Sequence, residues 1–259
     1  MSLIYGVPEM AEEEVLEQIA FQAVQYLRLD DPKYKKADTL SKILVAAKDK
    51  PKEDEIVYID ALESIIGENG SYKDLGDAKI VDKSWDTEGT QFNIKGFQAC
   101  AFEFNGEINV CFRGTPDGAW IDNGYGMAGG DYLIPYENAE QGVSNLGVSP
   151  MQHNALEYMQ SIVDKNEGKV INISGHSKGG NLSVYASVKC DRNIQKRIVK
   201  VYSNDGPGFS EEMIQSKEYQ WMLPKIKTIL PESSIVGMLL EHQEKFEVVK
   251  SSQSGIQQH

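Results

Sequence analysis

The segment from Val170 to Leu182 constrains the fold of this chain more than any other part of the sequence. A short apolar run, Val170 to Ser174, leads into the pentapeptide Gly175-His176-Ser177-Lys178-Gly179, and small residues then open a helix-like run. This order predicts a buried strand, a tight turn that carries Ser177, and a helix. The bare Gly-x-Ser-x-Gly pattern occurs by chance in roughly one chain in ten of this length. The strand before it and the helix after it therefore make the prediction specific.

A serine on such a turn is well placed for nucleophilic chemistry. Glycines two residues before and after Ser177 let neighbouring backbone pass close by, because glycine has no Cβ. The hydroxyl then projects above the end of the strand, and the first amides of the helix face the charge that develops on an acyl oxygen. The motif therefore predicts Ser177 as a catalytic nucleophile.

Helix and strand patterns divide the remainder of the chain. Apolar residues at helical spacing mark three segments of the first third, which are 11–29, 37–47 and 53–66. The period changes to two near Phe92, and Asn105-Gly106 between two apolar runs predicts a hairpin with a type I′ turn. The strands expected from this change onward are 97–104, 108–112, 170–174, 198–203, 226–230 and 246–249.

Strands that alternate with helices indicate an α/β fold with a mostly parallel central sheet and helices on both faces. We expect a mainly helical N-terminal region at 1–90 that packs on a core formed by 91–259. The glycines and aromatic residues of 117–147 predict a mobile lid within that core.

Composition narrows the range of partners. A formal charge of −13 repels nucleic acid and anionic headgroups, and no basic cluster with interleaved aromatics offsets it, so membrane lipid would need a local apolar surface. The sequence has no apolar run of ~18 residues and no signal-peptide pattern, which favours a cytoplasmic protein. Three cysteines without CxxC spacing fit reduced structural thiols better than a zinc site. We expect no metal or other cofactor, and the oligomeric state is open.

Several motifs together resemble a known family. Phe112-Arg113-Gly114-Thr115 at a strand end, Trp120 shortly after it, and the Ser177 pentapeptide followed by Gly180 are similar to the core of the class 3 lipases. These are the fungal triacylglycerol lipase type within the α/β-hydrolase superfamily. The similarity covers about 97–259, with further matches at Val201-Tyr202, Pro207, Ile235-Val236, His242, Glu244, Phe246 and His259. Within the superfamily, 204–209 and 234–240 resemble most a bacterial group of lipase-like domains of unassigned function.

The resemblance implies a function and roles for individual residues. It implies a serine hydrolase that cleaves a carboxylic ester, of lipase, lysophospholipase or esterase type, through an acyl-enzyme on Ser177. The backbone amides of Thr115 and Lys178 would form the oxyanion hole, while Arg113 is expected to be structural. His259 would be the general base. Acyl transfer by the same residues is a weaker option, and the alternative of another class is an inactive α/β-hydrolase scaffold that binds a ligand or a protein.

Two features depart from the lipase pattern. Lipases carry an apolar residue after the nucleophile, so Lys178 is expected to place a cation at the mouth of the site. Their triad aspartate aligns with Ser234, which cannot supply a negative charge. Asp205 is the preferred acid because it directly follows a strand, at the edge of the sheet where Ser177 emerges. Glu232 is the main rival and Asp191 a poor third, and Asp205 could instead cap its own loop as an Asx-turn residue.

Only four histidines can serve as the base. His176 adjoins Ser177, but its side chain is expected to point away from the turn. His153 is expected to be a surface or capping residue, and His242 matches a lipase histidine that is not catalytic. His259 follows the last strand in the order serine, acid, histidine, although a base at the end of the chain would be poorly held.

Three other patterns receive structural interpretations. Residues 124–129 match G-x-G-x-x-G, but no strand precedes them and no helix follows, so they predict a loop and not a dinucleotide site. Glu12-Glu13-Glu14 predicts the first turn of a helix and not a metal site. Lys33, Lys35 and Lys36 form a basic patch too small for nucleic acid.

Overall fold

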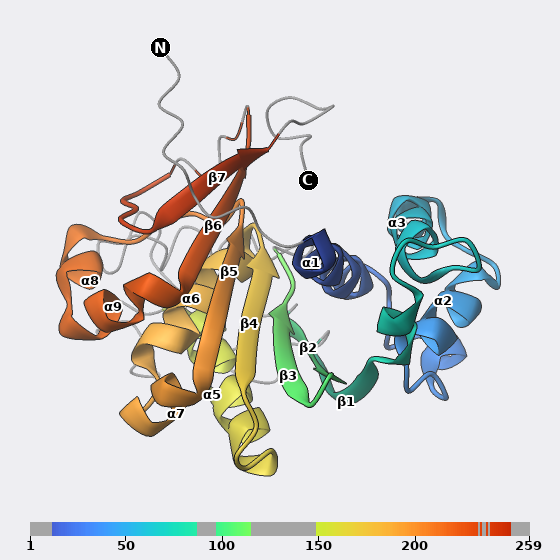
Figure 1. Cartoon of the computed structure of the whole chain (residues 1–259), viewed down its shortest axis with the longest axis horizontal. Helices are drawn as coiled ribbons and strands as arrows, with labels where there is room; N and C mark the ends of the chain where they lie inside the picture. The colour runs from blue at the N-terminus through green and yellow to red at the C-terminus, as the bar shows by residue number, and fades with distance from the viewer. Residues whose placement is uncertain are drawn as a thin grey trace, which may run out of the picture.

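A computed structural model describes residues 12–86, 97–114, 149–232, 234, 237 and 239–249. Within these residues a seven-stranded sheet forms the centre of the molecule (Figure 1). The strand order follows the chain, and the strands are β1 (Lys79–Asp86), β2 (Phe97–Phe104), β3 (Glu107–Phe112), β4 (Ile171–His176), β5 (Ile198–Asn204), β6 (Ile226–Pro231) and β7 (Lys245–Val249).

The sheet is antiparallel at one side and parallel from β3 onward. β1 pairs with β2 and β2 with β3 in antiparallel register, and each later pair of strands is parallel. The β2–β3 hairpin turns at Asn105 and Gly106, whose φ angles of 51° and 79° are those of the expected type I′ turn. The mostly parallel sheet predicted from the sequence is therefore confirmed, and β1 is a strand that the sequence analysis missed.

The first third of the chain is largely helical, as expected. It contains α1 (Glu12–Gln25), η1 (Pro32–Tyr34), α2 (Leu40–Lys48), η2 (Glu53–Glu55), α3 (Ile56–Ile66) and η3 (Lys73–Asp77). Three glutamates occupy the first turn of α1, where they favour the helix dipole. The hydroxyl of Thr39 caps α2 by accepting from the Lys42 amide at 3.4 Å. α1 packs on β2, β3 and β4, with α3 outside it.

Longer helices cover the opposite face of the sheet. They are α5 (Pro150–Lys165) and α6 (Lys178–Lys189), followed by α7 (Arg192–Arg197), α8 (Glu211–Gln215), α9 (Lys217–Met222) and η5 (Leu223–Lys225). α5 begins with a capping box in which Ser149 and Gln152 bond each other's backbone amides. α6 is central, because it contacts β3, β4, β5, α5 and α9.

Two hydrophobic cores result, one on each face of the sheet. Alternate residues of β2 supply both, since Ala99 and Ala101 join the core beneath α5 and α6, while Cys100 and Phe102 join the core beneath α1 to α3. All three cysteines are buried and free of disulfides. In the described part of the chain, no helix is both long and apolar enough to cross a membrane.

Candidate active site

Ser177 occupies the sharp turn between β4 and α6. Its backbone has φ 54° and ψ −126°, a conformation that residues with a Cβ rarely adopt and that costs about 1–3 kcal/mol. Two hydrogen bonds hold the turn, one from the Ser177 amide to the Asn204 carbonyl and one from the Gly180 amide to the Ser177 carbonyl, both 2.8 Å long. The strand–turn–helix predicted from the sequence is therefore present, with the strain typical of a nucleophile turn.

The two glycines of the motif are required by close backbone contacts. A Cβ on Gly175 would lie 2.0 Å from the carbonyl oxygen of Gly179, and a Cβ on Gly179 would lie 2.2 Å from that of Phe112. Both distances are far shorter than any tolerated carbon–oxygen contact. Glycine at these positions lets α6 start directly against the ends of β3 and β4, which places Ser177 at the carboxyl edge of the sheet.

The expectation for Lys178 is wrong in one respect. Its side chain is only 1% exposed, so it places no cation at the mouth of the site. The reason is the position of α6, which is buried along its whole length from Lys178 to Val188. The backbone amide of Lys178 still belongs to the first turn of that helix, where a second oxyanion donor is expected.

Asp205 follows β5 directly and is buried, with 3% of its surface exposed. Its own φ is also positive, at 53°, and its amide bonds the Ile229 carbonyl at 2.7 Å. Its Oδ1 accepts hydrogen bonds from the Ser234 hydroxyl and from the Gly237 amide at 3.1 Å. Both donors lie in the segment after β6 and not in the loop of Asp205 itself. These contacts differ from those of an Asx turn, in which the carboxylate bonds its own loop.

The carboxylate of Asp205 therefore lies beside the residue that aligns with the triad acid of the lipases. β4 and β5 are adjacent and parallel, and His176 pairs with Asn204 in their register. Ser177 and Asp205 each follow one of these partners, so they leave the same edge of the sheet on neighbouring strands.

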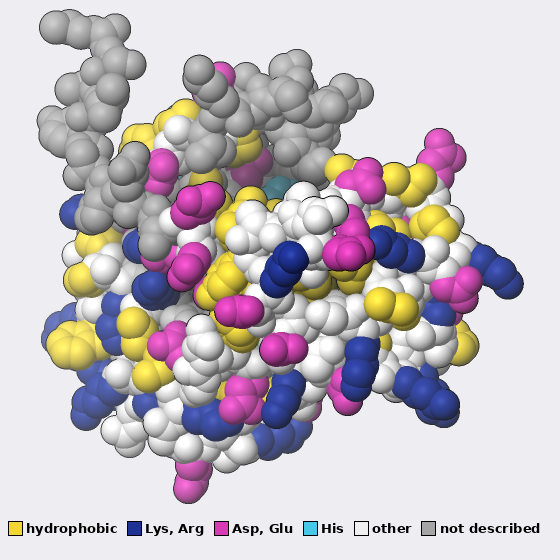
Figure 2. Space-filling view, turned by 45° about the vertical axis from the view of Figure 1, so that its right-hand side comes forward, with side chains coloured by type: hydrophobic (Ala, Val, Ile, Leu, Met, Phe, Trp, Pro, Cys, Tyr) yellow, Lys and Arg dark blue, Asp and Glu magenta, His cyan; other side chains and the backbone are white. Residues whose placement is uncertain are grey.

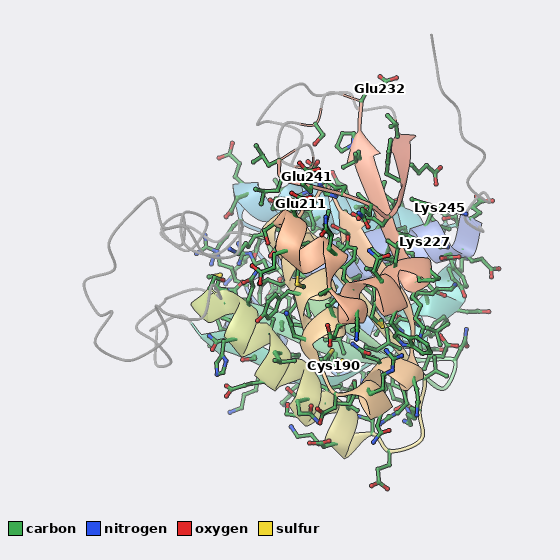
Figure 3. The ribbon with its side chains drawn as sticks, turned by 90° about the vertical axis from the view of Figure 1, so that its left-hand side faces the viewer. Cys190, Glu211, Lys227, Glu232, Glu241 and Lys245 are labelled. Carbon is green, nitrogen blue, oxygen red and sulfur yellow. The ribbon has the colours of Figure 1, made fainter. Side chains whose placement is uncertain are left out.

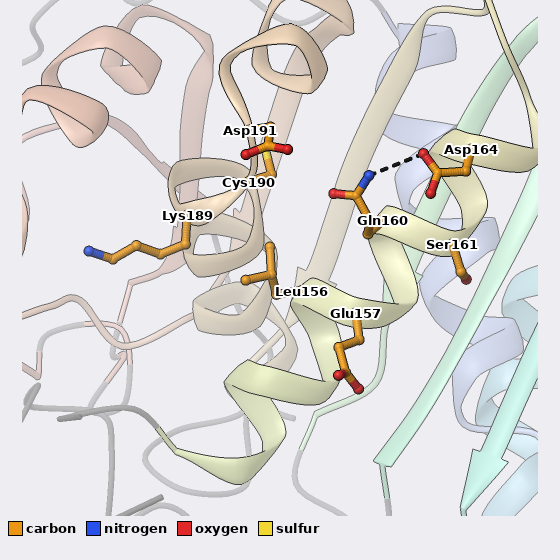
Figure 4. Close-up of a pocket in the computed structure, with 8 residues that line it drawn as sticks. All are labelled: Leu156, Glu157, Gln160, Ser161, Asp164, Lys189, Cys190 and Asp191. Carbon is orange, nitrogen blue, oxygen red and sulfur yellow. Dashed lines mark hydrogen bonds between the residues drawn. The ribbon is translucent and has the colours of Figure 1, made fainter. Parts of the chain in front are cut away.

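The two rival acids lie in less suitable places. Glu232 is exposed at the outer end of β6, and its side chain points away from the sheet (Figure 3). Asp191 precedes α7 at the other end of α6, where it lines a shallow groove with Cys190 and residues of α5 (Figure 4). Burial raises the pKa of the Cys190 thiol to about 12, so this groove presents no reactive thiolate at neutral pH.

Three of the four histidines lie in the described part of the chain. His176 points toward α1, where its Nδ1 lies 2.6 Å from the hydroxyl of Tyr26, so it turns away from the nucleophile as expected. His153 lies at the surface, with its Nε2 3.1 Å from Glu157 Oε1. His242 is half-buried and pairs with Glu244, with 2.8 Å between Nδ1 and Oε1.

The His242–Glu244 pair has the strongest electrostatic perturbation near the last strand. Burial raises the pKa of the Glu244 carboxyl, but hydrogen bonds from His242, Tyr219 and Thr228 outweigh it and bring the pKa to about 2. Burial lowers the pKa of His242, and the Glu244 carboxylate more than reverses this effect. The pair meets one requirement of a catalytic dyad, yet the described structure gives no contact between His242 and Ser177. It fixes the segment between β6 and β7.

Tyr26 is a site residue that the sequence analysis missed. A Cβ on Gly114 would lie 2.6 Å from the Tyr26 hydroxyl and 3.3 Å from the Cβ of Ser177, so Tyr26 and Ser177 flank the same glycine. Burial raises the pKa of Tyr26, so the phenol stays protonated at neutral pH. Arg113 lies over the Tyr26 ring at 5.3 Å and donates to Gln98, which agrees with a structural role. No local pattern marks Tyr26, because only the packing of α1 brings it here.

Several predicted features lie outside the described residues. They are Thr115, His259, the G-x-G-x-x-G stretch at 124–129 and the expected lid at 117–147. Among the residues that are described, no cluster of histidine, cysteine, aspartate or glutamate could hold a metal ion.

Comparison with known proteins agrees with the resemblance seen in the sequence. The model of a lipase-like family described as Mbeg1-like matches residues 137–259. No curated protein matches the sequence.

Similar solved structures are fungal lipases, all at low identity. The triacylglyceride lipase of Rhizomucor miehei is 14% identical, with a TM-score of 0.55 over 93% of this chain and 82% of that chain. The lipase of Rhizopus microsporus var. chinensis is 13% identical, with a TM-score of 0.51 over 93% and 75%. A triacylglycerol lipase whose catalytic centre is a serine protease triad is 12% identical, with a TM-score of 0.50 over 88% and 74%. The chain thus has the α/β-hydrolase fold of the class 3 lipases.

Proposed function

We propose that this protein is a serine hydrolase that cleaves a carboxylic ester, of lipase, lysophospholipase or esterase type, through an acyl-enzyme on Ser177. The strained turn at Ser177 is the observation that carries the proposal. A side chain held at positive φ, with both flanking glycines required by contacts of about 2 Å, costs stability that packing alone does not explain. The fold of the fungal lipases and the lipase-like family model support the same conclusion.

In the proposed reaction, Ser177 Oγ attacks the ester carbonyl while His259 takes its proton. The backbone amides of Thr115 and Lys178 stabilise the oxyanion, which can contribute about 3 kcal/mol for each donor. The tetrahedral intermediate collapses, and the alcohol leaves with the proton from the imidazolium. Water then repeats the sequence on the acyl-enzyme and releases the carboxylic acid. The roles of His259 and Thr115 rest on the sequence resemblance alone.

Asp205 is proposed as the acid that orients the base. A triad acid must be ionised, fixed in position and at the same sheet edge as the serine. Asp205 is buried at that edge, and donors from Ser234 and Gly237 hold its Oδ1. Both donors favour the charged carboxylate. In this protein the acid would therefore come from the strand before the one that supplies it in lipases, with Ser234 as its hydrogen-bond donor.

Labelling with a fluorophosphonate probe tests the proposed function. The folded wild-type protein should react at one site, and Ser177→Ala should abolish labelling and the hydrolysis of short p-nitrophenyl esters. Ser161→Ala is a matched control, because its hydroxyl only donates to the Tyr158 carbonyl on α5. Failure of the intact wild-type protein to label would favour the inactive scaffold that binds a ligand or a protein.

A further inference from the structure

A pocket beside the nucleophile turn lies on the face of the sheet that α1 covers. It has a volume of about 470 Å³ and lies between α1, α3 and the carboxyl ends of β4 to β7. Ligand pockets in proteins measure about 300–1,000 Å³. Figure 2 shows this side of the molecule, where a histidine side chain lies among hydrophobic ones. The pocket is therefore large enough for part of a small molecule, and all its lining residues are described.

The wall and the mouth of the pocket are apolar. α1 contributes Val15, Ile19 and Ala23, and α3 contributes Val57 and Ala61. At the mouth, Ile19 is 44% exposed and Val57 is 65% exposed. Apolar side chains left in water gain free energy when an apolar group covers them, at about 25 cal/mol for each Å².

Most polar groups at the inner end of the pocket already have partners. Tyr26 and His176 are joined by their 2.6 Å contact, and Nε2 of Gln22 donates to Ser174 at 2.9 Å. The Oε1 atoms of Gln18 and Gln22 are buried without a hydrogen-bond partner in the described structure. A hydroxyl on the ligand would gain a hydrogen bond at either oxygen. The pocket thus fits a mainly hydrocarbon chain.

The inner end of the pocket adjoins the proposed nucleophile. His176 lines the pocket and is the residue before Ser177, while Tyr26 lies across Gly114 from the Ser177 Cβ. An ester whose carbonyl carbon lies at Ser177 can therefore extend its chain along α1. Glu247 stands at the same pocket and the whole chain carries a charge of −13, which disfavours a free carboxylate ligand.

We infer that this pocket binds the acyl chain of a neutral, medium-length ester, an inference that rests on the proposed esterase function. At the packing density of protein interiors, a pocket of this size takes a chain on the order of ten carbon atoms. Release of the product would be assisted because hydrolysis converts the bound ester into a carboxylate near Glu247.

Substitutions that fill the pocket test the inference through substrate length. Ala61→Trp narrows the wall, and Val57→Trp blocks the mouth at a position too exposed to threaten folding. Ala46→Trp and Val45→Trp are matched controls, because both residues line a separate groove on α2. We expect kcat/KM for p-nitrophenyl decanoate to fall about tenfold or more in the two pocket variants, with acetate hydrolysis unchanged. An equal effect on both esters, or no effect on either, would overturn the inference.

A binding measurement separates this inference from the proposed reaction. The Ser177→Ala protein should bind 1-decanol, as an increase in melting temperature, and Val57→Trp in the same background should abolish the increase while Val45→Trp retains it. Loss of fluorophosphonate labelling in the wild type together with such decanol binding would refute the hydrolase and support the pocket. Labelling at Ser177 without any decanol binding would refute the pocket and leave the hydrolase in place.

Discussion

Replacing Ser177 by glycine should stabilise the protein relative to replacing it by alanine. Alanine keeps the Cβ in the unfavourable backbone conformation at φ 54°, whereas glycine adopts it freely. Both variants lack the hydroxyl, so their difference isolates the backbone strain from the chemistry.

The expected size of the difference follows from two opposing effects. Relief of the strain contributes about 1–3 kcal/mol in favour of glycine. The greater freedom of glycine in the unfolded chain costs about 0.4–1 kcal/mol. Ser177→Gly should therefore be more stable than Ser177→Ala by roughly 1 kcal/mol, which corresponds to roughly 2–4 °C in melting temperature for a domain of this size.

Chemical denaturation and thermal melting of both variants measure the difference. Ser64, on the exposed side of α3, provides the control, because glycine in an ordinary helix should be less stable than alanine by about 1 kcal/mol. The sign should thus reverse between the two sites. Equal stability of the Ser177 pair, or a less stable glycine variant, would show that the turn carries no strain.

Two further predictions concern carboxylates. Asp205→Asn should reduce kcat on the order of ten-thousandfold, as expected for a triad acid, while Glu232→Gln leaves it nearly unchanged. The reverse result, in variants that are folded by circular dichroism, would place the acid after β6. The pKa of Glu244 is lowered from 4.5 to about 2, so its stabilising contribution is complete above pH 4.5 and disappears as the pH falls toward 2. The free energy of unfolding should fall by about 3 kcal/mol over this interval, and Glu244→Gln should flatten that slope in pH-dependent urea denaturation; an unchanged slope would contradict the buried pair.

The local features of the fold and of the nucleophile turn follow from the sequence, because they depend on residues close together in the chain. Asn105-Gly106 determines a type I′ hairpin, since both residues tolerate positive φ. The order of strand, Gly-x-Ser-x-Gly and helix likewise determines the turn at Ser177. β1 was missed because its Lys79–Asp86 segment mixes charged and apolar residues, as befits the first strand of the sheet.

Only the tertiary structure decides which distant residues meet at this turn. The sequence cannot show that Tyr26 packs beside Gly114, because that contact depends on how α1 crosses the sheet. Lys178 was expected at the surface, yet the burial of α6 on all sides encloses it. Ser234 reads as the loss of an acid, whereas the fold places it as a donor to Asp205 from the neighbouring strand. Short-range backbone preferences fix the turn itself, and long-range packing chooses the side chains that surround it.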